Sequence, residues 1–216
     1  ELIKALKRTN GLIVERVCSS LGEIADSMAV PGLIGIANHG RWQVREQATG
    51  ALGKCRDTRA NEVVNAALTD TIGQVRKSAA VAAGELKLHQ SIPALVHLLA
   101  DDFYGARMCA LESLVSLDSM IVVAVITDSM FSPNARIGDR ACAALGKLHT
   151  ARARDLLMMQ TKSSDPNRRA HAGVALIYAD PLDSCGFQDQ ILSAENDPRV
   201  KLKLRSAVAA GKKISK

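Results

Sequence analysis

Apolar residues recur at spacings of three and four along nearly the whole chain, as expected for amphipathic α-helices. Val75, Ala79, Ala82 and Ala83 form one such set, and residues 92–99 form the next. Glycines or polar residues separate neighbouring sets and are typical of turns. The pattern therefore predicts pairs of helices joined by short turns.

Local signals agree with helices in most places. Asp165-Pro166 and Asp197-Pro198 each place a capping carboxylate before a proline, which favours the first turn of a helix. One β-branched run, residues 121–126, has the propensity of a strand. Because this run falls where the second helix of a pair belongs, we predict a helix there.

The helix pairs repeat with a period of 31 residues. Residues 43–53 and 74–84 show the same order of small and apolar side chains when they are laid in register. Six copies and a truncated seventh cover nearly the whole chain, at about residues 10–40, 41–71, 72–102, 103–133, 134–164, 165–196 and 197–216. A fixed period of this length indicates a stacked array in which each repeat packs on its neighbours. We expect a single array over residues 1–216.

Two motifs carry the repeat. Residues 44–53 read Val-Arg followed by Ala-x-x-Ala-Leu-Gly, and residues 92–99 read Ile-Pro-Ala-Leu-x-x-Leu-Leu. Over roughly residues 11–211 the chain resembles proteins built from the short HEAT repeat of the phycobilin-lyase type. The resemblance implies an all-α fold, a right-handed superhelical α-solenoid of antiparallel helix pairs with a convex and a concave layer. This scaffold serves many unrelated roles, so the resemblance does not specify an activity.

The composition suits such an array. Hydrophobic residues make up 47% of the chain but aromatic residues only 3%, so the core must consist of Ala, Val, Leu and Ile on closely packed helices. No apolar run reaches the roughly 18 residues that a membrane span needs, and no signal-peptide pattern is present. The five cysteines contain no Cys-x-x-Cys pair, which indicates a reducing compartment, and we predict a cytoplasmic protein. Cys18 and Cys142 share one repeat position, so we expect both in the core.

Charge is unevenly distributed. Residues 1–131 hold 13 basic and 14 acidic residues, whereas residues 132–216 hold 15 basic and 8 acidic residues. A basic C-terminal third can serve as a patch for nucleic acid, an acidic peptide or a phospholipid surface. It can equally be a solvated helix face followed by a soluble tail. The chain starts at Glu1 and ends at Lys216 without a capping segment, which is consistent with part of a longer protein.

Arginines and aspartates also recur in register. Arg45, Arg76 and Arg107 share one position, and Asp70 and Asp101 each lie six residues before an arginine. In the family that the chain resembles, such arginines pair with acidic groups near the turns, so the resemblance implies a structural ladder between repeats. Position 138 is a glycine where the next arginine is expected. We therefore expect the ladder to be weakest near the fifth repeat.

The concave surface is where solenoids usually bind, and the second helices should line it. The side chains that the register places there are mostly small or apolar and would suit an amphipathic helix or an extended peptide. The alternative is that they pack between repeats or against a neighbouring domain. The candidate partner-binding residues, from this face and from the basic patch, are His97, Val125, Asp128, Arg152, Arg154, Leu156, Met159, Arg168 and Arg169.

Enzyme classes with this scaffold leave no recognisable signature here. Phycobilin lyases share the repeat type, but no motif identifies a bilin site, and the paired His-Glu motifs of deoxyhypusine hydroxylases are absent. We therefore predict no catalytic residue, cofactor or metal. The sequence favours a non-enzymatic scaffold or adaptor that binds another protein. The alternatives are a binder of nucleic acid or another polyanion through the basic C-terminal repeats, whose affinity would fall steeply with salt, and an accessory subunit of a lyase-type enzyme.

Overall fold

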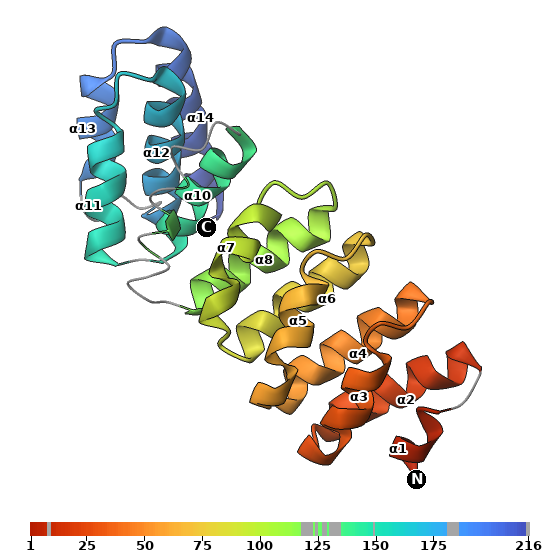
Figure 1. Cartoon of the computed structure of the whole chain (residues 1–216). Helices are drawn as coiled ribbons and strands as arrows, with labels where there is room; N and C mark the ends of the chain where they lie inside the picture. Colours follow the sequence, from red (N-terminus) through yellow and green to blue (C-terminus); the bar gives the residue numbers. More distant parts are fainter. Residues whose placement is uncertain are drawn as a thin grey trace. The chain divides into compact units, whose positions relative to one another are not determined.

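The computed structural model describes residues 1–7, 10–117, 123, 125–126, 129, 135–148, 150–180 and 186–214. They belong to two compact units, an N-terminal unit of residues 1–117 and a C-terminal unit of residues 118–216. Every regular element in the described ranges is helical (Figure 1). The predicted all-α repeat fold is confirmed.

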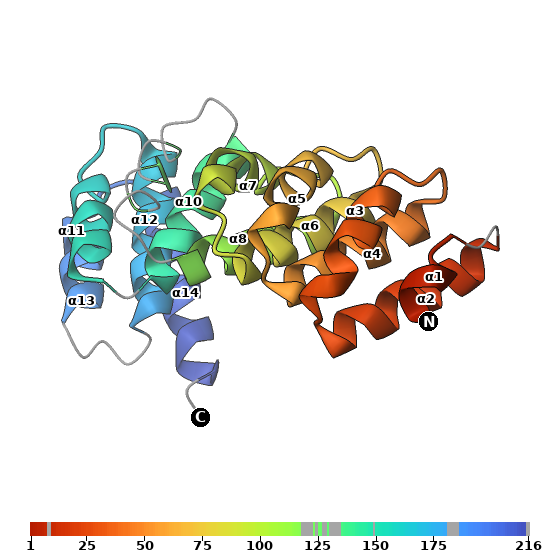
Figure 2. The same ribbon diagram turned by 60° about the horizontal axis from the view of Figure 1, so that its bottom comes forward.

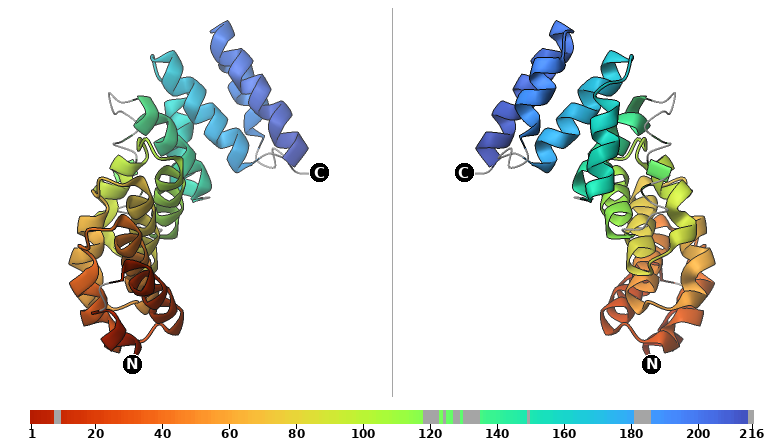
Figure 3. Two further views of the ribbon diagram at one scale, coloured as in Figure 1. Left: turned by 90° about the vertical axis from the view of Figure 1, so that its right-hand side faces the viewer. Right: turned by 90° about the vertical axis from the view of Figure 1, so that its left-hand side faces the viewer.

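The N-terminal unit has two layers of helices. Its first helices are α2 (Gly11–Ile24), α4 (Trp42–Cys55), α6 (Gly73–Glu85) and α8 (Tyr104–Leu117), and each packs on the next. Its second helices are α3 (Val30–Ile36), α5 (Asn61–Ala67) and α7 (Ile92–Leu98), each of which packs on the first helix that follows it. Short 3-10 turns at Ser27–Ala29, Thr58–Ala60 and His89–Ser91 lead into them, and α1 (Leu2–Ala5) packs on α2. Figures 2 and 3 show the two layers from other sides.

The C-terminal unit repeats this arrangement. Its first helices are α10 (Ala135–Lys147), α12 (Pro166–Ala179) and α14 (Pro198–Ile214), with α12 between the other two. The second helix α11 (Ala151–Gln160) packs on α10 and α12, and α13 (Phe187–Ala194) packs on α12 and α14. Asp165 caps α12 as predicted, since its carboxylate accepts the N–H of Asn167 at 2.9 Å.

The β-branched run adopts the predicted helix wherever it is described. Val123, Val125 and Ile126 are helical, and Val123 and Ile126 are buried. The Ser129 hydroxyl donates to the Val125 carbonyl at 2.6 Å, a bond between residues one helical turn apart. Burial in the stack therefore overrides the strand propensity of these side chains.

Close approach of the first helices explains the Ala-Leu-Gly motif. A Cβ atom added at Gly53 would lie 2.6 Å from Ala82 Cα on the next first helix, and one added at Gly22 would lie 2.9 Å from Ala51 Cα. One added at Gly146 would lie 2.8 Å from the Ala175 carbonyl oxygen, and one added at Gly84 would lie 2.8 Å from the Ser113 hydroxyl oxygen. The glycine is thus required because atoms of the following first helix, mostly backbone, occupy the space of a side chain.

The predicted ladder is present between repeats of the N-terminal unit. Arg45 binds both carboxylate oxygens of Asp70, at 2.7 and 2.9 Å, and Arg76 binds those of Asp101, at 2.6 and 2.8 Å. Each arginine also donates to a carbonyl six residues before it, that of His39 at 2.9 Å and that of Asp70 at 2.7 Å. Each arginine therefore links the turn before its own helix to the turn one repeat later, and each such link is one rung of the ladder.

The aspartates of the ladder serve two repeats at once. Asp70 and Asp101 also accept the N–H groups of Ile72 and Phe103, at 2.8 and 2.7 Å, within their own turns. Burial opposes their ionisation, but the hydrogen bonds from arginine and backbone outweigh it, so the pKa of each carboxyl is lowered. Both carboxylates are thus held ionised by the contacts that join the repeats.

The ladder of the N-terminal unit ends at Arg107. Its Nη1 donates to the carbonyls of Asp101 and Asp102 at 2.6 and 3.0 Å, as in the other rungs. Its buried Nε finds no hydrogen-bond acceptor among the residues that the structure describes. The residue 25 positions later is Ser132, which offers no carboxylate. Among the described residues, Arg107 is therefore the first arginine of the ladder whose Nε has no acceptor, and the expected weakening near the fifth repeat stays a prediction.

A rung that the sequence did not predict lies in the C-terminal unit. Arg169 binds the two carboxylate oxygens of Glu195 at 2.8 and 3.2 Å and donates to the carbonyls of Ser163 and Ser164, both at 3.0 Å. The hydrogen bond from Arg169 lowers the pKa of Glu195. Arg169 therefore occupies a structural position equivalent to that of Arg45 and Arg76.

Substitution of the motif glycine tests the close approach. Gly53→Ala should lower the free energy of unfolding by about 1–3 kcal/mol, because the added methyl group overlaps Ala82 of the next helix. Gly50→Ala in the same helix is the matched control, since nothing lies within 4 Å of its added Cβ, and it should raise stability by up to about 1 kcal/mol. Urea denaturation measures both, and equal effects of the two substitutions would contradict the packing argument.

Removal of one ladder charge tests the rung. Asp101→Asn should lower the free energy of unfolding by about 2–3 kcal/mol at pH 7, because it weakens a charged, largely buried pair. The control Glu15→Gln, in the more exposed Arg41–Glu15 pair, should cost at most about 1 kcal/mol.

The same variant should change the pH dependence of stability. Because the folded pKa of Asp101 is lowered, its contribution is complete above the unfolded carboxyl pKa of about 4 and is lost as the pH falls through the folded pKa. Denaturation between pH 7 and pH 2 should therefore give a shallower acid loss in Asp101→Asn than in the parent chain. Parallel curves for the two proteins would show that the rung does not stabilise the fold.

Candidate functional site

The predicted site residues come from several elements. His97 is exposed on α7 of the N-terminal unit, and Val125 is half-buried in helical conformation. Asp128 lies outside the described residues. The other candidates lie on α11 and α12 of the C-terminal unit.

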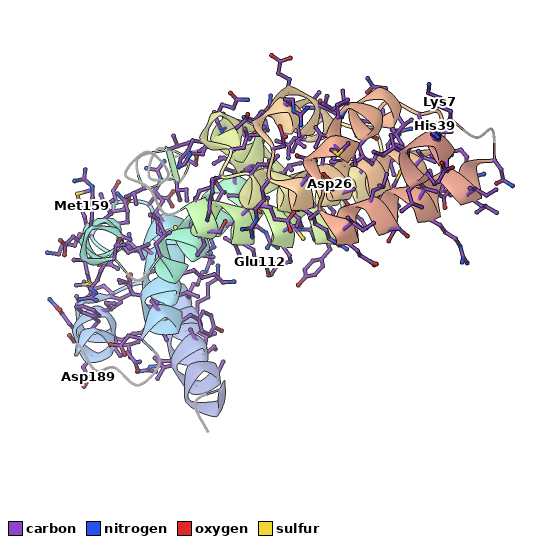
Figure 4. The ribbon with its side chains drawn as sticks, turned by 90° about the horizontal axis from the view of Figure 1, so that it is seen from below. Lys7, Asp26, His39, Glu112, Met159 and Asp189 are labelled. Carbon is purple, nitrogen blue, oxygen red and sulfur yellow. The ribbon has the colours of Figure 1, made fainter. Side chains whose placement is uncertain are left out.

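Helix α11 carries most of the candidates. Arg152, Leu156 and Met159 follow one another at spacings of four and three, so they lie on one face of the helix. Arg152 is exposed, Leu156 is half-buried and Met159 is 56% exposed. In Figure 4, Met159 on α11 and Asp189 on α13 lie on the same side of this unit. The predicted apolar and basic residues of α11 thus share an accessible surface.

The predicted basic patch divides into two parts. Arg154 is exposed, and its guanidinium lies 5.8 Å from the ring centre of Phe187, a cation–π contact between α11 and α13. Arg168 lies 3.6 Å from Asp165 in a surface pair, which stabilises little. Arg169 is largely buried in its rung with Glu195. Arg152 and Arg154 therefore offer accessible charge, whereas the charge of Arg169 is compensated inside the stack.

The structure adds a groove that the sequence did not predict. A cavity of about 340 Å³ lies between the outer faces of α10 and α12. The described residues that line it are mainly small or apolar, with one tyrosine, two basic residues and no acidic one: Ala143, Gly146, Lys147, His171, Val174, Ala175, Tyr178 and Ala179.

The register contains a signal for this groove. Tyr178 is 48% exposed. In the four preceding repeats, the residues at the same repeat position are Lys147, Ser116, Glu85 and Lys54. An exposed aromatic residue at a position that is otherwise polar marks a surface that differs from the other repeats. Comparison of outward-facing positions between repeats could therefore have identified Tyr178.

The described thiols are buried or half-buried. Cys18 and Cys142 are buried, as predicted, and burial raises the pKa of Cys18 to about 12. Burial also raises the pKa of Cys55 and of Cys109, so these thiols stay protonated at neutral pH. Within the described ranges, no group of three His, Cys, Asp or Glu side chains could hold a metal ion. Nor is any helix there long and apolar enough to cross a bilayer.

Comparison with known proteins identifies the repeat. The sequence model of HEAT repeats matches residues 30–115. No curated protein shows significant sequence similarity to the chain.

Solved structures with a similar fold cover nearly the whole chain. The complex of CpcE and CpcF of phycocyanin lyase from Nostoc sp. PCC7120 matches with 19% identity and a TM-score of 0.55, over 97% of this chain and 92% of that one. An archaeal HEAT-like repeats protein from Thermococcus onnurineus NA1 matches with 16% identity and a TM-score of 0.52, over 97% and 100%. An engineered protein matches with 18% identity and a TM-score of 0.52, over 95% and 96%. At these identities the likeness concerns the fold alone: residues 30–115 match HEAT repeats, and the chain has the all-α fold of a HEAT-like repeat solenoid.

Proposed function

We propose that this chain is a non-catalytic scaffold that binds a segment of another protein in the groove between α10 and α12. The observation that carries the proposal is the groove itself, an accessible apolar cavity of about 340 Å³ between two helices that pack on each other. Concave apolar sites with a few polar groups are the usual form of binding sites. A volume of this size accommodates two or three bulky apolar side chains of a partner.

Charge specifies the kind of segment. Lys147 is exposed and His171 half-buried at the groove, and none of the described side chains that line it is acidic. Residues 132–216 also carry seven more basic than acidic residues. A partner helix with apolar anchors and flanking carboxylates would therefore be complementary to this surface. Because α10 and α12 are held in the stack before binding, little ordering cost would oppose association.

A second candidate function is binding of nucleic acid or another polyanion. The exposed Arg152 and Arg154 on α11 and the basic composition of the C-terminal unit favour it. Phosphate contacts would make the affinity fall steeply with ionic strength, whereas apolar contacts in the groove would not. Salt dependence therefore separates the two candidates.

Affinity capture from a native lysate, with and without nuclease, tests the proposal. Ala143→Glu places a carboxylate in the groove and should reduce capture of the partner at least about tenfold. Val81→Glu is the matched control, because Val81 stands at the same repeat position two periods earlier and is 38% exposed, and capture should be unchanged.

Further outcomes of the same experiment distinguish the groove from the face of α11 and from binding of nucleic acid. Loss of the partner in Arg152→Glu/Met159→Glu, but not in Ala143→Glu, would move the site to the predicted face of α11. Loss of all bound material on nuclease treatment would identify nucleic acid as the ligand and overturn the protein scaffold. Copurification of a chromophore or a catalytic subunit would instead indicate an accessory subunit of an enzyme.

A further inference from the structure

The groove between α10 and α12 has two polar ends and an apolar floor. Ala143 on α10 and Val174 on α12 share one repeat position, and Lys147 and Tyr178 share the position one turn later. His171 lies on α12 seven residues before Tyr178, which corresponds to a rise of about 10 Å. The lysine and the tyrosine therefore stand at one end of the groove and the histidine at the other, with the apolar side chains between them.

The walls of the groove determine the conformation of a segment that can fill it. Because α10 and α12 pair their backbone groups internally, a bound segment meets side chains. Among the described lining residues, the polar side chains are those of Lys147, His171 and Tyr178, all at the ends. An extended segment would leave the N–H and C=O groups that face the apolar floor unpaired, whereas an α-helix pairs them within itself. The occupant that fits the groove is therefore an α-helix.

The ends of α10 and α12 give the groove a direction. α10 ends at Lys147 and α12 at Ala179, so the negative ends of both helix dipoles lie at the same end of the groove as Tyr178. The Lys147 ammonium favours a carboxylate there, and a carboxylate stabilises the first turn of a helix but not the last. A bound helix with its N-terminus at this end also opposes the two dipoles. Both electrostatic contributions therefore favour an antiparallel orientation.

We infer that the segment bound in this groove is an α-helix of about two to three turns that runs antiparallel to α10 and α12. Two large apolar side chains, three or four residues apart, fill the floor beside Ala143 and Val174. An Asp or Glu one turn before the first of them pairs with Lys147. This inference rests on the proposed protein-binding function and specifies the conformation, direction and sequence pattern of the bound segment.

Selection from a library of random peptides displayed on phage tests the pattern. Peptides of about 12 residues, a length at which an isolated helix is marginal in water, are selected on the immobilised 216-residue chain. They are counter-selected on Ala143→Glu, whose added carboxylate blocks the groove. The enriched peptides should share the two apolar positions and the acidic residue before them. A synthetic copy should be largely unfolded alone and should gain helical circular dichroism when the chain is added.

A charge reversal at the end of the groove tests the acidic position. Lys147→Glu should weaken binding of the synthetic peptide about tenfold, and replacement of the peptide's acidic residue by lysine should restore the affinity for this variant. Lys54→Glu is the matched control, because Lys54 is exposed at the same repeat position in the N-terminal unit, and its replacement should leave the affinity unchanged. Thermal unfolding shows whether each variant is folded.

A photoreactive benzophenone at either end of the synthetic peptide tests the direction. At the first residue of the peptide it should crosslink to residues 175–179, at the C-terminal end of α12. At the last residue it should crosslink to residues 167–171, at the other end of the groove. Mass spectrometry of the digested products identifies the crosslinked residues.

The outcomes separate this inference from the proposed function. Groove-dependent peptides that bind without gaining helix, or equal effects of Lys147→Glu and Lys54→Glu, would overturn the inference and leave the groove as a binding site. Reversed crosslinks would overturn the antiparallel direction. Failure of every peptide to distinguish the parent chain from Ala143→Glu would overturn the groove itself, and with it both proposals.

Discussion

The close approach of successive first helices is the constraint on which the rest of this structure depends. Ala82 lies where a side chain of Gly53 would be, and Ala51 where one of Gly22 would be. Helices at this separation cannot accommodate large side chains between them, so the core is filled by Ala, Val and Leu. This explains why 47% of the residues are hydrophobic but only 3% are aromatic. Each repeat gains its stability from its neighbours, since no helix pair encloses a core of its own.

The arginine–carboxylate ladder holds the turns in positions that apolar packing alone does not determine. Apolar contacts between small side chains are weakly directional, whereas a bidentate arginine–carboxylate pair has a fixed geometry. Because Asp70 accepts from Arg45 and its backbone carbonyl accepts from Arg76, one residue sets the spacing of three consecutive turns. The same logic recurs in the C-terminal unit at Arg169 and Glu195. Packing thus sets the distance between repeats, and the ladder sets their angular register.

Much of this architecture can be predicted from the sequence, because the repeat period is recognised from the order of the residues alone. The helix pairs, the helical conformation at Val123, Val125 and Ile126, and the rungs of Arg45 and Arg76 all follow from register. The rung of Arg169 was missed because a one-residue insertion shifts its acid from 25 to 26 positions away. The groove was missed for a different reason. It depends on how Ala143 and Tyr178 face each other across two helices, which spacing within one helix does not specify.

The outward position occupied by Tyr178 has a consequence for how such an array can change. Lys54, Glu85, Ser116 and Lys147 stand at the same position in other repeats, and none of them is part of a ladder rung. A substitution at this position alters what the surface presents without touching the arginine pairs of the ladder. It does touch the glycine contacts, because the side chains of Lys54, Glu85 and Ser116 lie within 4 Å of where a Cβ atom would stand on the motif glycine of the preceding repeat. The surface at this position can therefore change one repeat at a time while the ladder stays the same, within the space that the close approach of the helices leaves.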